Sequence, residues 1–280
     1  MNPSNNLSGD FKVLLVGCGE MGSAMLDGWL MSGLSKKRIF IVEHNPEKLA
    51  RIKEKGLFCS SKAQDVPDEF IPDVVFFAVR PQNMEETVKL FTKYKSSKTV
   101  FLSIVAGKTI NYFSSILGSD AEIVRAMPNS PAKVLRGITV AYANETASED
   151  KRLLCSALLN AVGEIIWVRD ENLMDAVTAV SGTGPAYLFH LVEALAIAGV
   201  NAGLPEYLSM KLARSTICGA GELLYQTAET ATNLRKEVTT QGGTTAAAFD
   251  VLLDPKNGLA ELMTRAVANA AKRSKELASK

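Results

Sequence analysis

The stretch KVLLVGCGEMGSAMLDGWL, residues 12–30, decides the fold of this chain. It begins with a continuous apolar run, which is typical of a strand buried on both faces. The glycine pattern G-x-G-x-x-G follows at once, with glycines at positions 17, 19 and 22, and a helix-favouring segment begins within it. A strand, a tight glycine turn and a helix in this order predict the first βα unit of a dinucleotide-binding domain.

Each glycine of this turn has its own expected role. Gly17 permits the tight turn, Gly19 lets the main chain approach a pyrophosphate, and Gly22 lets the helix pack closely against the strand. The helix N-terminus offers free N–H groups to the anion, and we include its residues Glu20 and Met21 in the expected cofactor site. A glycine-rich turn without a ligand is the less favoured alternative.

Working outward, the first part of the chain alternates short β-branched runs with helical patterns. We expect strands at residues 12–16, 38–42, 73–79, 99–105, 122–127, 137–143 and 164–168. Apolar strands separated by helices indicate a parallel sheet that is covered on both faces. Asn45-Pro46 and the pair Thr146 and Glu149 have the spacing of helix start signals.

The architecture changes near residue 170, after which the sequence is alanine-rich and shows no strand pattern. We therefore predict an α/β fold with two domains: a Rossmann-like dinucleotide-binding domain at 1–169 and an all-helical dimerisation and substrate-binding domain at 170–280. The apolar run at 185–204 predicts a buried helix rather than a membrane helix, because it carries His190, Glu193 and Asn201. Helices that are apolar on several faces need a cover, which either the α/β half or a second copy supplies. We favour the second copy: a homodimer, or a higher homo-oligomer built from such dimers.

Charge and cysteine content narrow the partners and the compartment. The 31 basic and 30 acidic residues nearly cancel and form no basic run, which argues against nucleic acid as a ligand. The four cysteines are scattered without a C-x-x-C pair, and the first residues lack the apolar core of a signal peptide. These features predict a cytoplasmic protein with free thiols and no membrane association.

Three further strand ends are expected to complete the cofactor groove. Glu43 ends the second strand, where an acidic side chain binds the ribose hydroxyls and favours NADH over NADPH, although a solvated strand-end glutamate fits nearly as well. Arg80 is a candidate contact to phosphate or ribose, and small residues let the nicotinamide lie close. The groove residues at the carboxyl ends of the third and fourth expected strands are Ala78, Val79, Arg80, Pro81, Ala106 and Gly107.

Residues that commonly act as acids, bases or metal ligands are scarce. Only two histidines occur: His44 lies near the expected adenosine end, and His190 lies in an apolar helix, where a core role is more common than catalysis. No Cys/His cluster or carboxylate pair has a metal-binding or nucleophilic spacing. A reaction that needs little proton transfer therefore fits best.

Six motifs together resemble the pyrroline-5-carboxylate reductase family. They are the glycine turn, AVRPQ (78–82), SIVAG (103–107), RAMPNSPAKVLRG (125–137), AVSGTGPAYLF (179–189) and VTTQGGTTAAA (238–248), and the likeness runs from about residue 12 to residue 278. The resemblance implies NAD(P)H-dependent reduction of the imine of L-1-pyrroline-5-carboxylate to L-proline, the last step of proline biosynthesis. Holding the iminium carbon against the nicotinamide then supplies most of the catalysis.

The Gly-Gly turn at 242–243 is the expected substrate cradle. Gly242, Gly243 and Thr244 have the setting to offer main-chain N–H groups to the substrate carboxylate at a helix start. The resemblance further implies that the Thr245 hydroxyl lies near the ring nitrogen, that Ser181 lines the active site, and that Met127 and Asn129 form a floor near the nicotinamide. Without the resemblance, the Gly-Gly turn is equally well a Schellman turn joining two helices. Likewise, the stretch at 181–185 could be only a helix N-cap with a proline near the first helical position.

The chain departs from the family pattern at three places: Gln241 replaces a usual proline, Arg80 replaces a usual lysine, and Glu43 stands where small or basic residues are common. The last departure makes NADH the favoured cofactor here, with NADPH as the alternative. Two other classes compete. A β-hydroxyacid dehydrogenase needs a catalytic lysine on the first long helix of its second half, and residues 186–203 contain no lysine. A non-catalytic dinucleotide sensor would have no reason to keep the polar Gly-Gly-Thr turn at 242–244.

Overall fold

The structure is a computed structural model that describes residue 7 and residues 9–96 and 98–278. The chain forms two compact units, Met1–Gly182 together with Ala271–Lys280, and Thr183–Ala270. The first unit contains an eight-stranded sheet, and the second is helical. The strands are β1 (Val13–Val16), β2 (Ile39–Val42), β3 (Phe58–Ser60), β4 (Val74–Phe77), β5 (Val100–Ser103), β6 (Glu122–Met127), β7 (Gly137–Ala143) and β8 (Gly163–Trp167).

The sheet has the order β3-β2-β1-β4-β5-β6-β7-β8. Strand β1 lies in the middle of its parallel part, where Val13 pairs with Ile39 of β2 on one side and with Val74 of β4 on the other. Every strand that the sequence predicts is present. The sequence does not predict β3, a three-residue strand at the sheet edge whose first residue, Phe58, is 56% exposed.

The expectation of a wholly parallel sheet is wrong for one pair. Strand β7 runs antiparallel to β6, and β8 then runs parallel to β7. The reason lies in the connection at residues 128–136, which contains only the short 3₁₀ turn Ser130–Val134. A parallel connection requires a longer crossover, usually a helix, so this short link returns the chain in the opposite direction.

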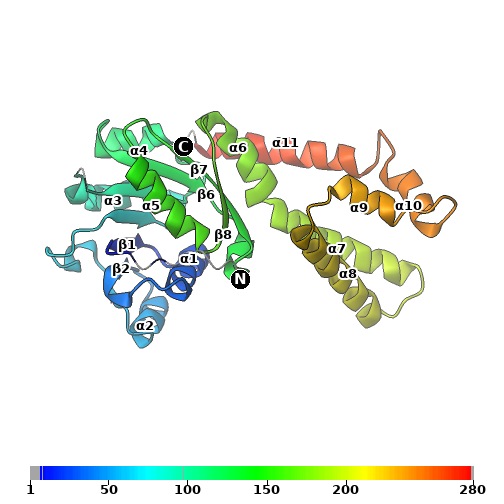
Figure 1. The fold of residues 1–280 in the computed structure, drawn as a ribbon, viewed down its shortest axis with the longest axis horizontal. Helices are drawn as coiled ribbons and strands as arrows, with labels where there is room; N and C mark the ends of the chain where they lie inside the picture. The colour runs from blue at the N-terminus through cyan, green and yellow to red at the C-terminus, as the bar shows by residue number, and fades with distance from the viewer. Residues whose placement is uncertain (1–6, 8, 97, 279–280) are drawn as a thin grey trace. The chain divides into compact units, whose positions relative to one another are not determined.

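Two apolar cores cover the two faces of the sheet. Val13 and Leu15 of β1 point to one face and Leu14 and Val16 to the other, as the alternation of a strand requires. The first core includes buried residues of α1 (Glu20–Met31), α2 (Pro46–Glu54) and α5 (Glu149–Asn160). The second includes residues of α3 (Met84–Leu90) and α4 (Ile110–Leu117). The sheet between these helices is visible in Figure 1.

Of the two predicted helix starts, the structure confirms the one at Asn45-Pro46 and not the one at Thr146. Asn45 caps α2, because its side chain accepts the N–H of Lys48 at 3.0 Å, and Pro46 occupies the first turn as expected. The expected role of Thr146 at α5 is wrong. That helix follows Ser148 as its N-cap, and the Thr146 hydroxyl donates instead to the carbonyl of Ala121, at 2.7 Å. A tertiary partner has replaced the local one.

After residue 170 the described residues form helices and connecting loops, with no strand. It begins with the 3₁₀ turn Glu171–Leu173, helix α6 (Met174–Val177) and the π-helical turn Thr178–Gly182. The longer helices that follow are α7 (Gly184–Asn201), α8 (Glu206–Gln226), α9 (Ala231–Glu237), α10 (Thr244–Leu252) and α11 (Leu259–Ala278). Helices α7 and α8 pack together, and the Ser209 hydroxyl donates to the carbonyl of Ala196 at 2.6 Å.

A single chain does not cover the apolar helix that the sequence predicts to be buried. On α7 only Ala196 is buried, whereas Phe189 and Ile197 are each 63% exposed. The helical run Glu171–Asn201 is long and apolar enough to cross a membrane by length and composition, and its most apolar part is almost entirely exposed in a single chain. An apolar face of this extent calls for a cover that a single chain does not supply.

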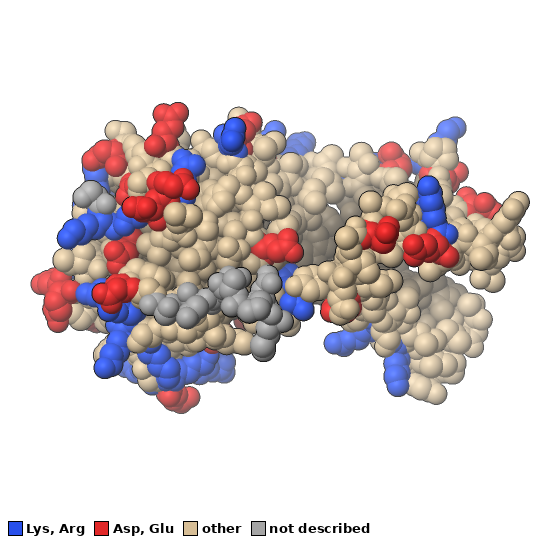
Figure 2. All heavy atoms as spheres, in the orientation of Figure 1, with Lys and Arg blue, Asp and Glu red and all other residues tan. Residues whose placement is uncertain are grey.

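Charged side chains of both signs are interspersed on the surface. On the face shown in Figure 2, lysines and arginines lie among aspartates and glutamates. This mixture agrees with the nearly equal counts of basic and acidic residues. It does not form the continuous basic surface that binding to a phosphate backbone requires.

Candidate active site

The glycine turn after β1 has a geometry that requires glycine. Gly17 has a φ of +88°, and its N–H donates to the carbonyl of Val42 at 2.8 Å. A Cβ on Gly17 would lie 2.8 Å from the carbonyl oxygen of Ala78, on the neighbouring strand end. A Cβ on Gly22 would lie 2.5 Å from the carbonyl oxygen of Gly17. Both positions therefore exclude any larger residue, as the dinucleotide motif predicts.

The glycine turn has free space beside Gly19, unlike at Gly17 and Gly22. Gly19 is the N-cap of α1 and has no side chain to cap the helix, so the first N–H groups of α1 lack a side-chain cap. A Cβ on Gly19 would have only the Nζ atom of Lys48 near it, at 3.8 Å. An uncapped helix start beside a lysine ammonium suits a phosphate group, so these residues fit a dinucleotide.

Glu20 and Met21 occupy the first turn of α1, as expected. The Glu20 carboxylate forms an ion pair with Lys133 from the 3₁₀ turn after β6, and the hydrogen bond from Lys133 lowers the pKa of Glu20. The pairing offsets the negative charge that Glu20 would otherwise add near an anion site. Met21 is half-buried and packs against the first apolar core, the one that contains Val13 and Leu15.

Glu43 lies inside the protein, so the interpretation as a solvated strand-end glutamate is wrong. The residue is 4% exposed. One carboxylate oxygen accepts the N–H of Cys18 at 2.8 Å, and the other accepts the N–H of Asn45 at 2.9 Å. The carboxylate thus joins the glycine turn to the start of α2. Sequence reasoning missed this role, because nothing local to Glu43 indicates that the Cys18 N–H lacks another partner.

The other expected cofactor residues follow β4 and β5, the strands next to β1 on one side. Ala78 donates its N–H to the carbonyl of Val16 at 2.8 Å and lies against the glycine turn. Val79 is half-buried, and Arg80 is exposed and precedes the 3₁₀ turn Pro81–Asn83. Ala106 is half-buried and Gly107 is buried, after the end of β5. Because β1, β4 and β5 are parallel neighbours, these segments meet at the carboxyl edge of the sheet.

The RAMPN segment packs against the π-helical turn. Asn129 is 8% exposed, and its amide nitrogen donates to the carbonyl of Ser181 at 3.1 Å while its amide oxygen accepts the N–H of Ile138 at 3.0 Å. A Cβ on Gly182 would lie 2.5 Å from the terminal methyl carbon of Met127. Asn129 and Met127 therefore hold the turn that carries Ser181.

The stretch at 181–185 does lead into a helix, because Thr183 is the N-cap of α7 and Pro185 lies in its first turn. Ser181 itself is not that N-cap. It lies in the π-helical turn, and its hydroxyl donates to the carbonyl of Val177 at 3.0 Å, while α7 begins later, after Thr183. Short π-helical turns are frequent at functional sites. The sequence shows no signal for this turn, because its hydrogen bonds arise where α6 meets the start of α7.

In the helical unit, the Gly-Gly turn precedes α10. Gly242 has a φ of +73°, and Gly243 is the N-cap of α10 with no side-chain cap. Helix α9 ends earlier, with Val238 as its C-cap, so a Schellman turn formed by the two glycines is not what joins the helices. Thr244 is exposed and Thr245 is half-buried, and they are the first two residues of α10. The start of α10 thus has main-chain N–H groups without a side-chain cap.

Neither histidine is placed as a buried catalyst in the chain. His190 is an exposed residue of α7 and contacts Glu193 at 3.1 Å, so the expectation that it is a core residue is wrong. His44 is also exposed and lies 3.6 Å from Glu43. Among the described residues there is no group of three or more His, Cys, Asp or Glu side chains arranged to hold a metal ion. All four cysteines are free thiols, as predicted.

The chain is similar to proteins of known family. Residues 171–277 match the family model described as pyrroline-5-carboxylate reductase dimerisation, and residues 12–107 match one described as NADP oxidoreductase, coenzyme F420-dependent. A pyrroline-5-carboxylate reductase from Arabidopsis thaliana is 36% identical over 269 residues, which cover 95% of each chain.

Two solved structures are also similar to this chain. That of a pyrroline-5-carboxylate reductase from Coxiella burnetii has a TM-score of 0.88 at 33% identity and covers 96% of this chain and 99% of its own. That of the Plasmodium falciparum pyrroline carboxylate reductase, with NADP bound, has a TM-score of 0.80 at 28% identity and covers 96% and 98%.

Proposed function

The chain belongs to the pyrroline-5-carboxylate reductase family, and we propose that it reduces the imine bond of L-1-pyrroline-5-carboxylate to form L-proline with a nicotinamide dinucleotide. This reaction is the last step of proline biosynthesis. The observation that carries the proposal is the combination of a glycine turn closed to side chains at Gly17 and Gly22 with an uncapped helix start above Gly19. That combination suits a dinucleotide pyrophosphate.

The cofactor residues are assigned from the carboxyl edge of the sheet. Gly17, Gly19, Glu20, Met21 and Gly22 surround the pyrophosphate; the other assigned cofactor residues are Glu43, Ala78, Val79, Arg80, Pro81, Ala106 and Gly107. When bound, the reduced nicotinamide supplies the hydride that the imine carbon accepts. The protein groups bind and orient both molecules and exclude water around them.

The substrate residues are assigned mainly from the start of α10. Main-chain N–H groups of Gly242, Gly243 and Thr244 bind the substrate carboxylate, because an uncapped helix start attracts an anion. The Thr245 hydroxyl lies near the ring nitrogen and holds a hydrogen bond there. Ser181 contributes a second hydroxyl, and Met127 and Asn129 form the floor near the nicotinamide, in part through the contacts that hold the Ser181 turn.

The scarcity of acid–base residues fits the substrate. A cyclic imine is protonated readily in water, and its iminium carbon accepts hydride without a strong acid. Exposed histidines and the lack of a metal cluster among the described residues are therefore compatible with the reaction. An alcohol substrate would instead require a proton acceptor, and α7 contains no lysine between residues 186 and 201.

We propose NADH as the favoured cofactor, with NADPH also accepted. The support is the negative charge of Glu43 at the end of β2, where the ribose of a dinucleotide lies in this fold. A carboxylate there repels a 2′-phosphate, even though its oxygens accept the N–H groups of Cys18 and Asn45. The Plasmodium falciparum relative contains NADP, so the effect of the Glu43 charge on cofactor choice is the point to test in this chain.

The helical part mediates a homodimer in this proposal. The match to a dimerisation family model and the exposed apolar side chains of α7 support it. By function we divide the chain into a dinucleotide-binding part, 1–169, and a dimerisation and substrate-binding part, 170–280. Further assembly of dimers into a larger homo-oligomer and a cytoplasmic location complete the proposal, and native mass measurement and cell fractionation test them.

The decisive experiment is the loss of absorbance from NADH and, separately, NADPH when L-1-pyrroline-5-carboxylate is added to the purified protein. We expect oxidation of the cofactor with an equal amount of proline formed, faster with NADH. Binding of both cofactors without oxidation would overturn the reductase assignment and favour a dinucleotide sensor. Oxidation with a strong preference for NADPH would overturn only the assignment of Glu43.

A further inference from the structure

A buried cation lies in the sheet outside the residues assigned so far. Arg125 lies within β6, between Ser103 of β5 and Tyr142 of β7, and is only 5% exposed. A charged side chain at such a position is costly unless an opposite charge and hydrogen bonds compensate for the lost water.

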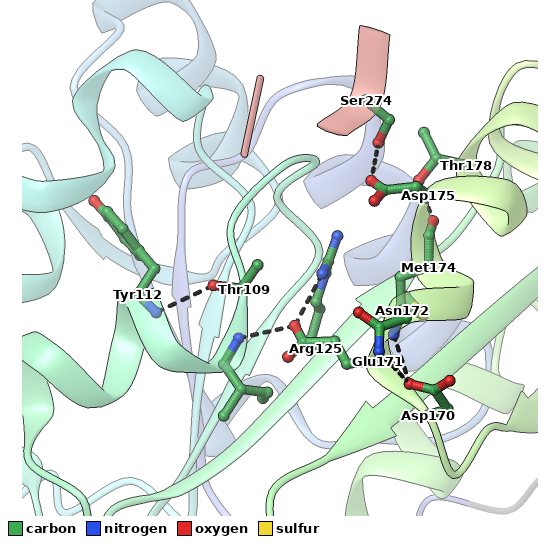
Figure 3. Close-up of polar contacts among 11 residues, drawn as sticks. Thr109, Tyr112, Arg125, Asp170, Glu171, Asn172, Met174, Asp175, Thr178 and Ser274 are labelled. Atoms are coloured by element: carbon green, nitrogen blue, oxygen red, sulfur yellow. Dashed lines mark hydrogen bonds and ion pairs between the residues drawn. The ribbon is translucent and has the colours of Figure 1, made fainter. Parts of the chain in front are cut away.

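The partner of Arg125 is Glu171, which comes from a different part of the chain. The guanidinium Nη1 atom donates to the Oε1 atom of Glu171 at 2.9 Å. The same oxygen accepts the N–H of Ile110, the first residue of α4, also at 2.9 Å. Figure 3 shows the Arg125 guanidinium and the Glu171 carboxylate pointing toward each other.

Glu171 itself is held in place by its neighbours. It begins the 3₁₀ turn Glu171–Leu173, which Asp170 caps by accepting the N–H of Asn172 at 2.9 Å. Further along, Asp175 accepts a hydrogen bond from the hydroxyl of Ser274 on α11, at 2.6 Å. The carboxylate therefore extends from an anchored segment rather than from a free loop, as Figure 3 also shows.

The bond to Ile110 fixes one end of the loop between β5 and α4. Thr109 already caps α4 by accepting the N–H of Tyr112 at 3.2 Å. Glu171 satisfies a second N–H of the same helix start and places a negative charge there, which the helix dipole favours. The loop held in this way is residues 104–109, which contains Ala106 and Gly107.

We propose that Arg125 and Glu171 are positioning residues for hydride transfer: the pair holds the loop at 104–109 in the one conformation that seats the nicotinamide. The inference rests on the proposed function for its catalytic consequence. Neither residue contacts the reacting atoms in this proposal. Arg125 holds the carboxylate, the carboxylate holds the Ile110 N–H, and the loop orients the nicotinamide against the imine carbon.

The pair is better suited to setting a geometry than to adding stability. Buried ion pairs contribute little net stability compared with apolar residues of similar size, but the loss of one partner leaves an uncompensated charge. Thr109 alone already provides a common cap for α4. The additional, directional bond from a carboxylate that is itself held by Arg125 is what a precisely oriented loop requires.

The test uses three variants and one control. Arg125→Met and Glu171→Ala each break the pair, while Arg125→Met combined with Glu171→Gln removes both charges and keeps an oxygen for the Ile110 N–H. The control is Lys89→Met, which breaks an exposed ion pair with Glu85 on α3, 2.6 Å long. For each protein one measures kcat and KM with the imine, the Kd of NADH from its fluorescence, and amide hydrogen exchange of residues 104–112.

We expect each single variant to lower kcat about tenfold or more while the Kd of NADH changes less than about threefold, because only the nicotinamide end loses its orientation. Exchange in the loop should accelerate by a similar factor. The double variant should recover part of both losses, since no charge is left without a partner and the Glu171→Gln amide keeps an acceptor for the Ile110 N–H, although Arg125→Met no longer holds it. The control should match the wild type.

Two results would overturn the inference. One is unchanged loop exchange in the single variants. The other is a kcat that falls only in proportion to the fraction of folded protein, with no recovery in the double variant. If the wild type does not reduce the imine at all, the proposed function fails instead, and loop exchange still decides whether the pair holds the loop.

Discussion

Replacing Glu43 by glutamine tests how the glycine turn is held. The buried carboxylate accepts the N–H groups of Cys18 and Asn45 at 2.8 and 2.9 Å. Hydrogen bonds to a charged group contribute about 1.5–3 kcal/mol each. Glutamine keeps one acceptor oxygen but turns its NH₂ group toward the other N–H donor. We therefore expect Glu43→Gln to lower the free energy of unfolding by about 2–3 kcal/mol, the value of one lost bond plus a donor–donor conflict.

Urea unfolding followed by circular dichroism measures this change, with Glu47→Gln as the control. Glu47 lies on the first turn of α2, is exposed, and undergoes the same change of charge. Surface substitutions of that kind stay within about 0.5 kcal/mol. A loss for Glu43→Gln no larger than that of the control would refute the argument that the carboxylate holds the turn.

The same position also decides the cofactor proposal. Glu43→Ser removes the charge, so the ratio of the NADH and NADPH dissociation constants should move toward NADPH. If Glu43 only holds the turn through Cys18, both affinities should weaken together and their ratio should stay the same. That outcome would leave the structural role of Glu43 intact and remove its role in cofactor choice.

Three further outcomes are expected. Thr245→Ala should lower turnover of the imine by about ten- to hundredfold with NADH binding unchanged; weaker cofactor binding with normal turnover per bound cofactor would show that the residue is misassigned. Asn129→Ala should lower the free energy of unfolding by about 1–3 kcal/mol, because the Ser181 carbonyl loses its donor, and urea unfolding at the level of the wild type would contradict this. Burial raises the pKa of the Cys155 thiol, whereas the unfolded thiol has a pKa of about 8.5, so stability should fall as pH rises above that value. The urea midpoint at pH 8 and pH 10 should show a larger drop in the wild type than in Cys155→Ala; an equal drop would exclude the thiol as the cause.

Local sequence patterns were sufficient to predict an element wherever a short segment determines its own structure. The apolar runs predicted the strands, and Asn45 followed by Pro46 predicted the start of α2. Gly17, Gly19 and Gly22 predicted a turn whose spacing admits no side chain at two of its three positions. These features depend on residues adjacent in the sequence, so their physical cause is present in the sequence itself.

Predictions failed where a partner distant in the sequence decided the outcome. Thr146 donates to Ala121 instead of capping a helix, and Ser181 lies in a π-helical turn that Asn129 holds. Strand β7 reversed direction because its connection is too short for a parallel crossover, although its apolar pattern suits either direction. The apolar pattern of α7 likewise indicates that other residues must cover the helix, but it does not indicate which molecule supplies them.

The sequence by itself determined the α/β architecture, the dinucleotide turn, the helical second part and the family. Periodicity and glycine spacing act over a few residues and need no knowledge of the fold. Only the tertiary structure decided that Glu43 is buried under the glycine turn, and that Arg125, Glu171 and Ile110 meet although they are far apart in the sequence. A buried charge is stable only with a partner, and that partner is chosen by the packing of the whole sheet.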